Sequence, residues 1–175
     1  MTASSASLLD RPLPPGVGVA SPAAVCARLR EWGIRACCLA DPARINPSAG
    51  SPEIGTVREL LDAVVAENHS YRWDLTADDL INVFPSHSVL DDQVDQLDCE
   101  SEGLWRILED RLRLRDHGIE LFQELEDGDG PTISVSLPSG SLRDALNAVV
   151  APIDAAVWHI SGSPGGWFLT VSSTA

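Results

Sequence analysis

The histidines of this 175-residue chain are the side chains best suited to metal binding or proton transfer. They are His69, His87, His117 and His159. No two of them have the HxxxH or HExxH spacing that sets two imidazoles on one face of a helix, and the GxSxG turn of a serine hydrolase does not occur. We therefore expect no enzymatic activity, no metal and no cofactor, although the fold could still bring two carboxylates together as an acid and a base.

Carboxylates are concentrated in two short stretches of the sequence. The segment EDGDGP at Glu126–Pro131 is similar to the start of a calcium loop, but a third acidic ligand and the closing glutamate are missing, so it predicts a connecting turn. The run DDQVDQLDCESE at Asp91–Glu102 predicts a solvated linker, with a divalent-ion site as the alternative.

The cysteines do not form a disulfide or zinc pattern. They are Cys26, Cys37, Cys38 and Cys99, with no CxxC pair among them. Cys37 and Cys38 are neighbours in a predicted strand, so they should point to opposite faces of a sheet and belong to different cores. All four are expected to be small buried hydrophobic residues rather than redox or metal-binding groups.

The net charge of −14 restricts the choice of partner. All twelve basic residues are arginine, and the absence of lysine excludes Schiff-base chemistry and the phosphate-loop lysine. An acidic surface repels nucleic acid and anionic lipid, so a basic or neutral protein is the expected partner. The sequence shows no apolar stretch long enough for membrane insertion and no visible export signal, which as written predicts a cytoplasmic protein.

The chain contains an internal repeat. The segment GTVRELLDAVVA at Gly55–Ala66 returns as GSLRDALNAVVA at Gly140–Ala151, with seven of twelve residues unchanged. The same shift of 85 positions carries Trp73 onto Trp158. The sequence therefore predicts two tandem copies of one small unit.

Hydrophobic periodicity predicts the elements of each copy. In the second copy, leucines and a tryptophan recur at helical spacing over residues 104–112, Gly118 ends the helix, and residues 119–122 are extended. Apolar residues then alternate with serine over residues 133–137, as in a strand with one buried face.

A second helix follows in each copy, and its start is marked by a glycine and a hydroxyl residue. Gly55 with Thr56 and Gly140 with Ser141 hold these positions, and Thr56 with Glu59 makes a capping box. The apolar stripes of these helices should face a core.

Each copy should close with a hairpin, formed by residues 71–75 with 80–83 and by residues 157–160 with 168–171. The second hairpin is three residues longer, and the excess falls in the turn SGSPGG. Trp73 and Trp158 in the first arms are expected to anchor the cores, with ligand stacking as the alternative.

The predicted fold is α+β, with the order strand, helix, strand, strand, helix, strand, strand in each copy. The segments RDHGIEL, ISVSLPSG, SLRDALNAVVAPI, VWHI and FLTV, in this order, resemble the secretin and TonB N-terminal short domain. The first copy should span residues 8–86, with a degenerate third strand at RINPSAGSPEIG. Residues 87–103 should form the acidic linker and a leading strand, and residues 104–173 the second copy.

This resemblance implies a non-catalytic, cofactor-free periplasmic module that contacts other proteins. Arg58 and Arg143 recur on the outer face of the second helices, where a repeated partner contact is one interpretation and a surface ion pair of Arg58 with Asp62 is the other. An exposed sheet edge is a further candidate surface. The alternative function is binding of a small ligand or peptide in a cleft between the copies, lined by Trp158 or Trp167.

Overall fold

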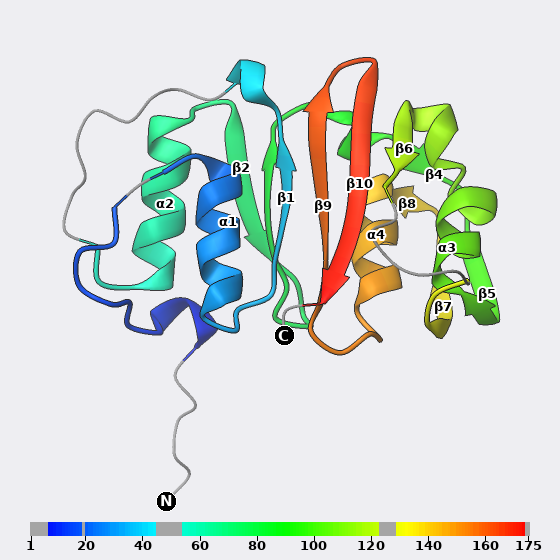
Figure 1. Cartoon of the computed structure of the whole chain (residues 1–175), viewed down its shortest axis with the longest axis horizontal. Coiled ribbons are helices and arrows are strands. Elements are labelled where there is room, and N and C mark those ends of the chain that lie inside the picture. Colours follow the sequence, from blue (N-terminus) through cyan, green and yellow to red (C-terminus); the bar gives the residue numbers. More distant parts are fainter. Residues whose placement is uncertain (1–6, 19, 45–53, 123–128, 174–175) are drawn as a thin grey trace, which may run out of the picture.

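A six-stranded mixed sheet runs through the centre of the protein (Figure 1). The structure, a computed structural model, describes residues 7–18, 20–44, 54–122 and 129–173. The strand order is β2-β3-β1-β9-β10-β6. The strands are β1 (Ala36–Ala40), β2 (Tyr71–Leu75), β3 (Ile81–Pro85), β6 (Ile119–Leu121), β9 (Ala156–Ser163) and β10 (Gly166–Ser173).

The two halves of this sheet have the same internal arrangement. In the first half β2 pairs antiparallel with β3, which pairs parallel with β1. In the second half β9 pairs antiparallel with β10, which pairs parallel with β6. The halves are joined by a parallel pair, β1 with β9, so β3, β1 and β9 form three adjacent parallel strands at the centre.

The helices of the two halves cover opposite faces of the sheet (Figure 1). Helices α1 (Pro22–Glu31) and α2 (Val57–Glu67) pack on the first half, and α3 (Leu104–Arg106) and α4 (Leu142–Val150) pack on the other side. Cys38 belongs to the core under α1 and α2, whereas Cys37 belongs to the core under α4. The predicted division of the two cysteines between opposite cores is confirmed, as is the α+β fold.

Helix α3 continues as a π-helical turn over Ile107–Arg111. The residues predicted to form its apolar stripe are all buried, and they are Leu104, Trp105, Leu108 and Leu112. A short 3-10 helix, Leu114–His117, follows, and Gly118 ends it with a φ of 70° that suits glycine. The predicted stop at Gly118 is therefore confirmed. The helix that ends there is the short 3-10 helix, which follows the helical segment that carries the apolar stripe.

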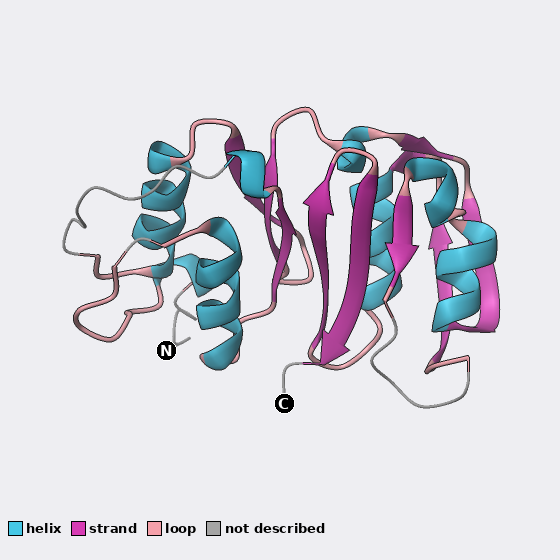
Figure 2. Cartoon of the chain, turned by 45° about the horizontal axis from the view of Figure 1, so that its top comes forward, coloured by secondary structure: helices cyan, strands magenta, loops and turns pink. Residues whose placement is uncertain are grey.

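Two small sheets complete the second half and lie beside α3 and α4 (Figure 2). They pair β4 (Gln93–Val94) with β8 (Gly140–Ser141), and β5 (Leu97–Gly103) with β7 (Thr132–Leu137). The acidic run Asp91–Glu102 is therefore not a solvated linker. Its apolar residues Val94, Leu97 and Cys99 are buried. Within β5, alternation turns Leu97 and Cys99 inward while Asp98 and Glu100 are exposed.

The remaining short elements are 3-10 turns at Leu8–Asp10, Pro42–Arg44 and Val89–Asp91. The residues that follow the first and the last of these turns, Arg11 and Asp92, each accept a hydrogen bond from the first residue of a helix, α2 or α4. The amide of Val57 donates to the carbonyl of Arg11 at 3.2 Å, and the amide of Leu142 donates to that of Asp92 at 2.8 Å. The degenerate third strand predicted in the first half falls mainly on residues 45–53, which lie outside the described residues.

Both second helices begin with a capping box. In α2 the Thr56 hydroxyl accepts the Glu59 amide and the Glu59 carboxylate accepts the Thr56 amide, as the sequence predicts. In α4 Ser141 and Asp144 make the same pair of bonds. These side chains satisfy amides that the first turn of a helix leaves without partners.

The closing hairpins have the predicted difference in length. Trp73 pairs with Val83, and Trp158 pairs with Val171. The partner of Trp158 is thus three positions further from its tryptophan than the partner of Trp73 is. Each indole N–H donates to the second helix of its own half, from Trp73 to Asp62 at 3.0 Å and from Trp158 to Asn147 at 2.8 Å. Trp158 is fully buried, as expected of an anchor, whereas Trp73 is half-buried at the outer strand β2.

Candidate functional site

Arg143 is not on a free helix surface. It lies between the halves, where its guanidinium is 3.2 Å from the Asp74 carboxylate on β2 and 4.6 Å from the centre of the Phe84 ring on β3. The sequence pattern places Arg143 on the polar side of α4. In the structure this side of the helix packs against β2 and β3 of the first half. The prediction that Arg58 and Arg143 both lie on an outer helix face is wrong for Arg143, because its side chain is only 21% exposed.

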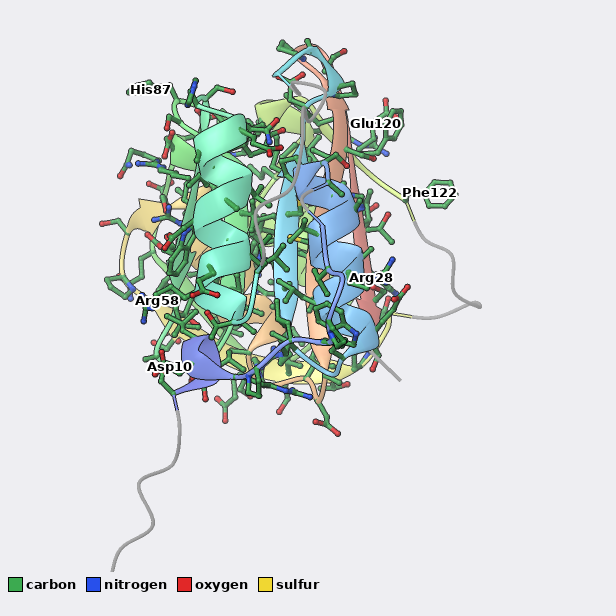
Figure 3. The ribbon with its side chains drawn as sticks, turned by 90° about the vertical axis from the view of Figure 1, so that its left-hand side faces the viewer. Asp10, Arg28, Arg58, His87, Glu120 and Phe122 are labelled. Atoms are coloured by element: carbon green, nitrogen blue, oxygen red, sulfur yellow. The ribbon has the colours of Figure 1, made fainter. Side chains whose placement is uncertain are left out.

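Arg58 occupies the corresponding position on α2 and is exposed (Figure 3). One interpretation of Arg58 is a surface ion pair with Asp62. In the structure the Asp62 carboxylate instead accepts the indole N–H of Trp73. A carboxylate beside a half-buried indole serves the hairpin rather than the helix surface.

Arg35, immediately before β1, joins the halves in a way that the sequence did not indicate. Its guanidinium donates to the carbonyl of Val150 at 3.0 Å and to that of Ala156 at 2.9 and 3.1 Å. Val150 is the last residue of α4, and its carbonyl also accepts the Ile153 amide at 3.1 Å. Arg35 therefore adds a second donor to this carbonyl and places a positive charge at the negative end of the helix.

The second half of the sheet exposes apolar side chains on the face opposite α4. Along β10, Trp167, Leu169 and Val171 point into the core under α4, so the residues between them point to the other face. Phe168 is 44% exposed there, and Phe122, just after β6, is 53% exposed. They are the exposed large hydrophobic residues of the described part of the chain.

Glu120 lies beside these two phenylalanines, because it is paired in register with Phe168. The amide of Phe122 donates to the carbonyl of Leu169 at 2.8 Å, which holds Phe122 against the same strand. Figure 3 shows Glu120 and Phe122 on the side of α1, with Phe122 directed away from the body of the protein. We call Phe122, Phe168 and Glu120 the open face.

The corresponding positions of the first half are buried. With the repeat shift and the longer second hairpin, Phe168 corresponds to Leu80 and Phe122 to Cys37, which are 1% and 0% exposed. These residues belong to the core that the second half completes with Leu90 and α4. Among the described residues, equivalent places in the two halves therefore differ in burial, and the second half presents larger apolar side chains at the exposed places.

His159 borders the open face on β9, opposite Cys38 of β1. Burial, and then the positive charge of Arg30, lower the pKa of this imidazole. Its Nε2 atom is buried and has no hydrogen-bond partner among the described residues. The lowered pKa favours the neutral imidazole.

A crevice of about 290 Å³ lies at the carboxyl ends of the three central parallel strands. Such a position is where open sheets with parallel strands commonly bind ligands. Trp167, predicted as an interaction residue, is 6% exposed and contributes to the wall of this crevice, whereas Trp158 does not. The wall also contains Leu39, Asp41, Pro85, His87, Ser88, Val89, Asp92, His117, Pro164 and Gly165.

The polar groups of the crevice include one defined pair. The Nδ1 atom of His117 lies 2.9 Å from the Asp92 carboxylate, which fixes the orientation of the imidazole. Of the four histidines, His87 and His117 reach this crevice, and His69 and His159 do not. No group of three or more metal-ligating side chains occurs within the described ranges.

The cysteines are free thiols and all four are buried. Burial raises the pKa of Cys37 and Cys99, and a hydrogen bond with Cys26 together with burial raises that of Cys38. A protonated, buried thiol is a poor nucleophile, which agrees with the prediction that these residues fill space.

Comparisons with protein-family models, with curated proteins and with solved structures find no match to this chain. Residues 126–128 of the calcium-like segment Glu126–Pro131 lie outside the described residues. Within the part of the chain that is described, no helix is both long and apolar enough to cross a membrane.

Proposed function

We propose that the chain is a non-catalytic protein-binding module made of two copies of one α+β unit, similar to the secretin and TonB N-terminal short domain. Four equivalences between the halves support the duplication. They are the strand order and directions, the hairpin pairing of Trp73 and Trp158, the capping boxes, and the indole hydrogen bonds at the same spacing of eleven residues. Unrelated halves would have no reason to share all four.

The open face is the observation that carries the binding proposal. Single exposed apolar side chains are common. Two phenylalanines, one on β10 and one directly after the neighbouring strand β6, at places that are buried in the other half, are instead typical of a binding surface. The net charge of −14 favours a basic or neutral protein. The exposed side of α2 with Arg58 is the competing surface.

The first prediction compares these two surfaces. A photoreactive benzoylphenylalanine at position 168 should crosslink a specific protein in a lysate of the source cells, and the crosslink should disappear when Phe122→Ser is added. The apolar contact is lost without disturbing the core, because Phe122 is largely exposed. Mass spectrometry of the crosslinked band provides the measurement.

Arg58→Glu in the same photoreactive chain is the matched control, and it should leave the band unchanged. A band that survives Phe122→Ser and is lost with Arg58→Glu would move the binding surface to α2. The absence of any specific band at position 168 would overturn the proposal for the open face.

A second candidate function is binding of a small molecule in the crevice, which its position at the ends of β3, β1 and β9 favours. Here a screen of small metabolites by NMR should give saturable shifts around Val89 and Trp167. Val89→Trp, which fills the hollow, should abolish those shifts and leave the spectrum of the open face unchanged. Shifts that persist in Val89→Trp would place the ligand elsewhere.

A further inference from the structure

We propose that the open face seats an amphipathic helix of a partner protein, and that an arginine or lysine beside the apolar stripe of this helix pairs with Glu120. This inference rests on the proposed function and specifies its partner. Three observations support it. They are the in-plane direction of the strand hydrogen bonds, the helical segments that cover the corresponding face of the first half, and the negative charge of Glu120.

The partner segment must satisfy its own backbone. The hydrogen-bonding groups of β10 lie in the plane of the sheet, where β9 and β6 pair with them. The edge strand β6 pairs with β10 on one side, and the groups on its outer side also lie in that plane, not on the face. The face of the sheet therefore offers Phe122 and Phe168 side chains but no backbone partners. A single extended strand laid on it would leave its amides unpaired, whereas a helix pairs its own.

The covered face of the first half shows the same choice within the chain. There, helical segments contribute the contacts, with Asp91 of the Val89–Asp91 turn 2.7 Å from Arg72 and Arg143 of α4 over Phe84. Each contact joins a charged helical side chain to a strand that also presents an apolar group. A helix with one flanking charge is thus the kind of element that this unit accepts on this face.

Glu120 determines the sign of that charge. Its counterpart in the first half is Arg35, which donates to the carbonyls of Val150 and Ala156. The ionised carboxylate of Glu120 can only accept hydrogen bonds, so the partner side chain that contacts it must be a donor. In the first half the roles are reversed, because Arg35 donates to carbonyls of the second half. A basic side chain next to the apolar stripe meets this requirement and also complements the acidic protein.

The same residues argue against a second copy of this chain as the occupant. A second copy would present α2 in the way that α4 is presented to the first half, and would bring carbonyl groups to Glu120. Its Arg58 would then approach His159, the counterpart of Asp74, instead of a carboxylate. Two chains of charge −14 also repel each other.

The experiment uses three synthetic peptides of about 18 residues, long enough for appreciable helicity. The first carries leucines at helical spacing flanked by arginines, the second replaces the arginines with glutamates, and the third has the composition of the first with leucines alternating as in a strand. Each is titrated into the isotope-labelled full chain, and backbone amide shifts are followed by NMR. Light scattering records the oligomeric state.

The basic helical peptide should give saturable shifts at Phe122, Phe168 and their neighbours. The acidic peptide should bind the natural chain at least about tenfold more weakly, equivalent to about 1.4 kcal/mol. Glu120→Arg should reverse this preference, because it exchanges the charge at the contact. Glu100→Arg, the same change at an exposed position of β5, should not reverse it and controls for general attraction to an acidic protein.

Stronger binding of the alternating peptide, equal reversal by Glu100→Arg, or no shifts at the open face would each overturn the proposal. A dimer in the absence of peptide, with its contacts at Phe122 and Phe168, would identify a second copy as the occupant and would also overturn it. A crosslink at position 168 to an extended or acidic segment would refute the helix and keep the binding function. Binding of the basic peptide without any crosslinked protein would keep the preference for a basic helix and refute the proposed binding function.

Discussion

Trp158→Ala is expected to lower the free energy of unfolding by about 3–5 kcal/mol, the usual loss when a large buried aromatic side chain is removed. The ring is fully buried in the core under α4, its indole donates to Asn147, and its backbone amide contacts the sulfur of Cys37 at 3.3 Å. A cavity at this position would weaken both the second core and the junction with β1. Urea denaturation followed by far-ultraviolet circular dichroism measures the loss.

Trp73→Ala is the matched control, since Trp73 makes the equivalent hydrogen bond at the outer strand and is only half-buried. We expect it to cost less than about 3 kcal/mol, because less apolar area returns to water. Trp158→Phe should cost about 1–3 kcal/mol, mainly for the unpaired Asn147 carbonyl. A larger cost for Trp73→Ala than for Trp158→Ala would contradict the role of the fully buried Trp158 as the stronger anchor.

Arg35→Met should destabilise the protein by about 2–3 kcal/mol, since hydrogen bonds from a charged group are worth more than neutral ones. Methionine keeps much of the aliphatic stem but removes every donor, leaving the carbonyls of Val150 and Ala156 without this partner. The loss should come from the junction, so amide hydrogen exchange should increase at the β1 and β9 pairing first. Chemical denaturation and hydrogen exchange test this together.

Arg28→Met is the control for removal of an arginine as such. The Arg28 side chain is 61% exposed and pairs with Glu31 one turn away, so the change should stay within about 0.5 kcal/mol. Arg35→Lys should recover only part of the stability, because an ammonium group cannot reach both carbonyls as a planar fork does. An Arg35→Met protein as stable as the natural chain would show that the junction depends on packing alone.

Much of the local structure was predictable because it follows from short-range rules. Thr56 with Glu59 marks the start of α2 by satisfying amides within one turn, and Gly118 ends its helix because a positive φ suits glycine. The two hairpins, including the extra three residues of the second, followed from alternation and turn composition. Cys37 and Cys38 separated between two cores because successive strand residues face opposite ways.

The predictions that failed concern what lies next to an element. Arg143 is on the polar side of α4, but that side meets Asp74 and Phe84 of the other half. The acidic run around Cys99 alternates like a strand, yet its composition alone suggested a linker. Trp167 looked available for a ligand, although the strand direction turns most of it into the core.

The sequence by itself determined where α2 and α4 begin, where the two hairpins lie, which faces of these elements are apolar, and that one segment occurs twice. Only the tertiary structure decided that β1 pairs in parallel with β9, that Arg35 reaches carbonyls 115 and 121 positions away, and that Phe122 and Phe168 are exposed. Periodicity and caps act over a few residues, so they are written in the local sequence. The choice of a neighbour across the sheet depends on the packing of the whole chain, and no local pattern records it.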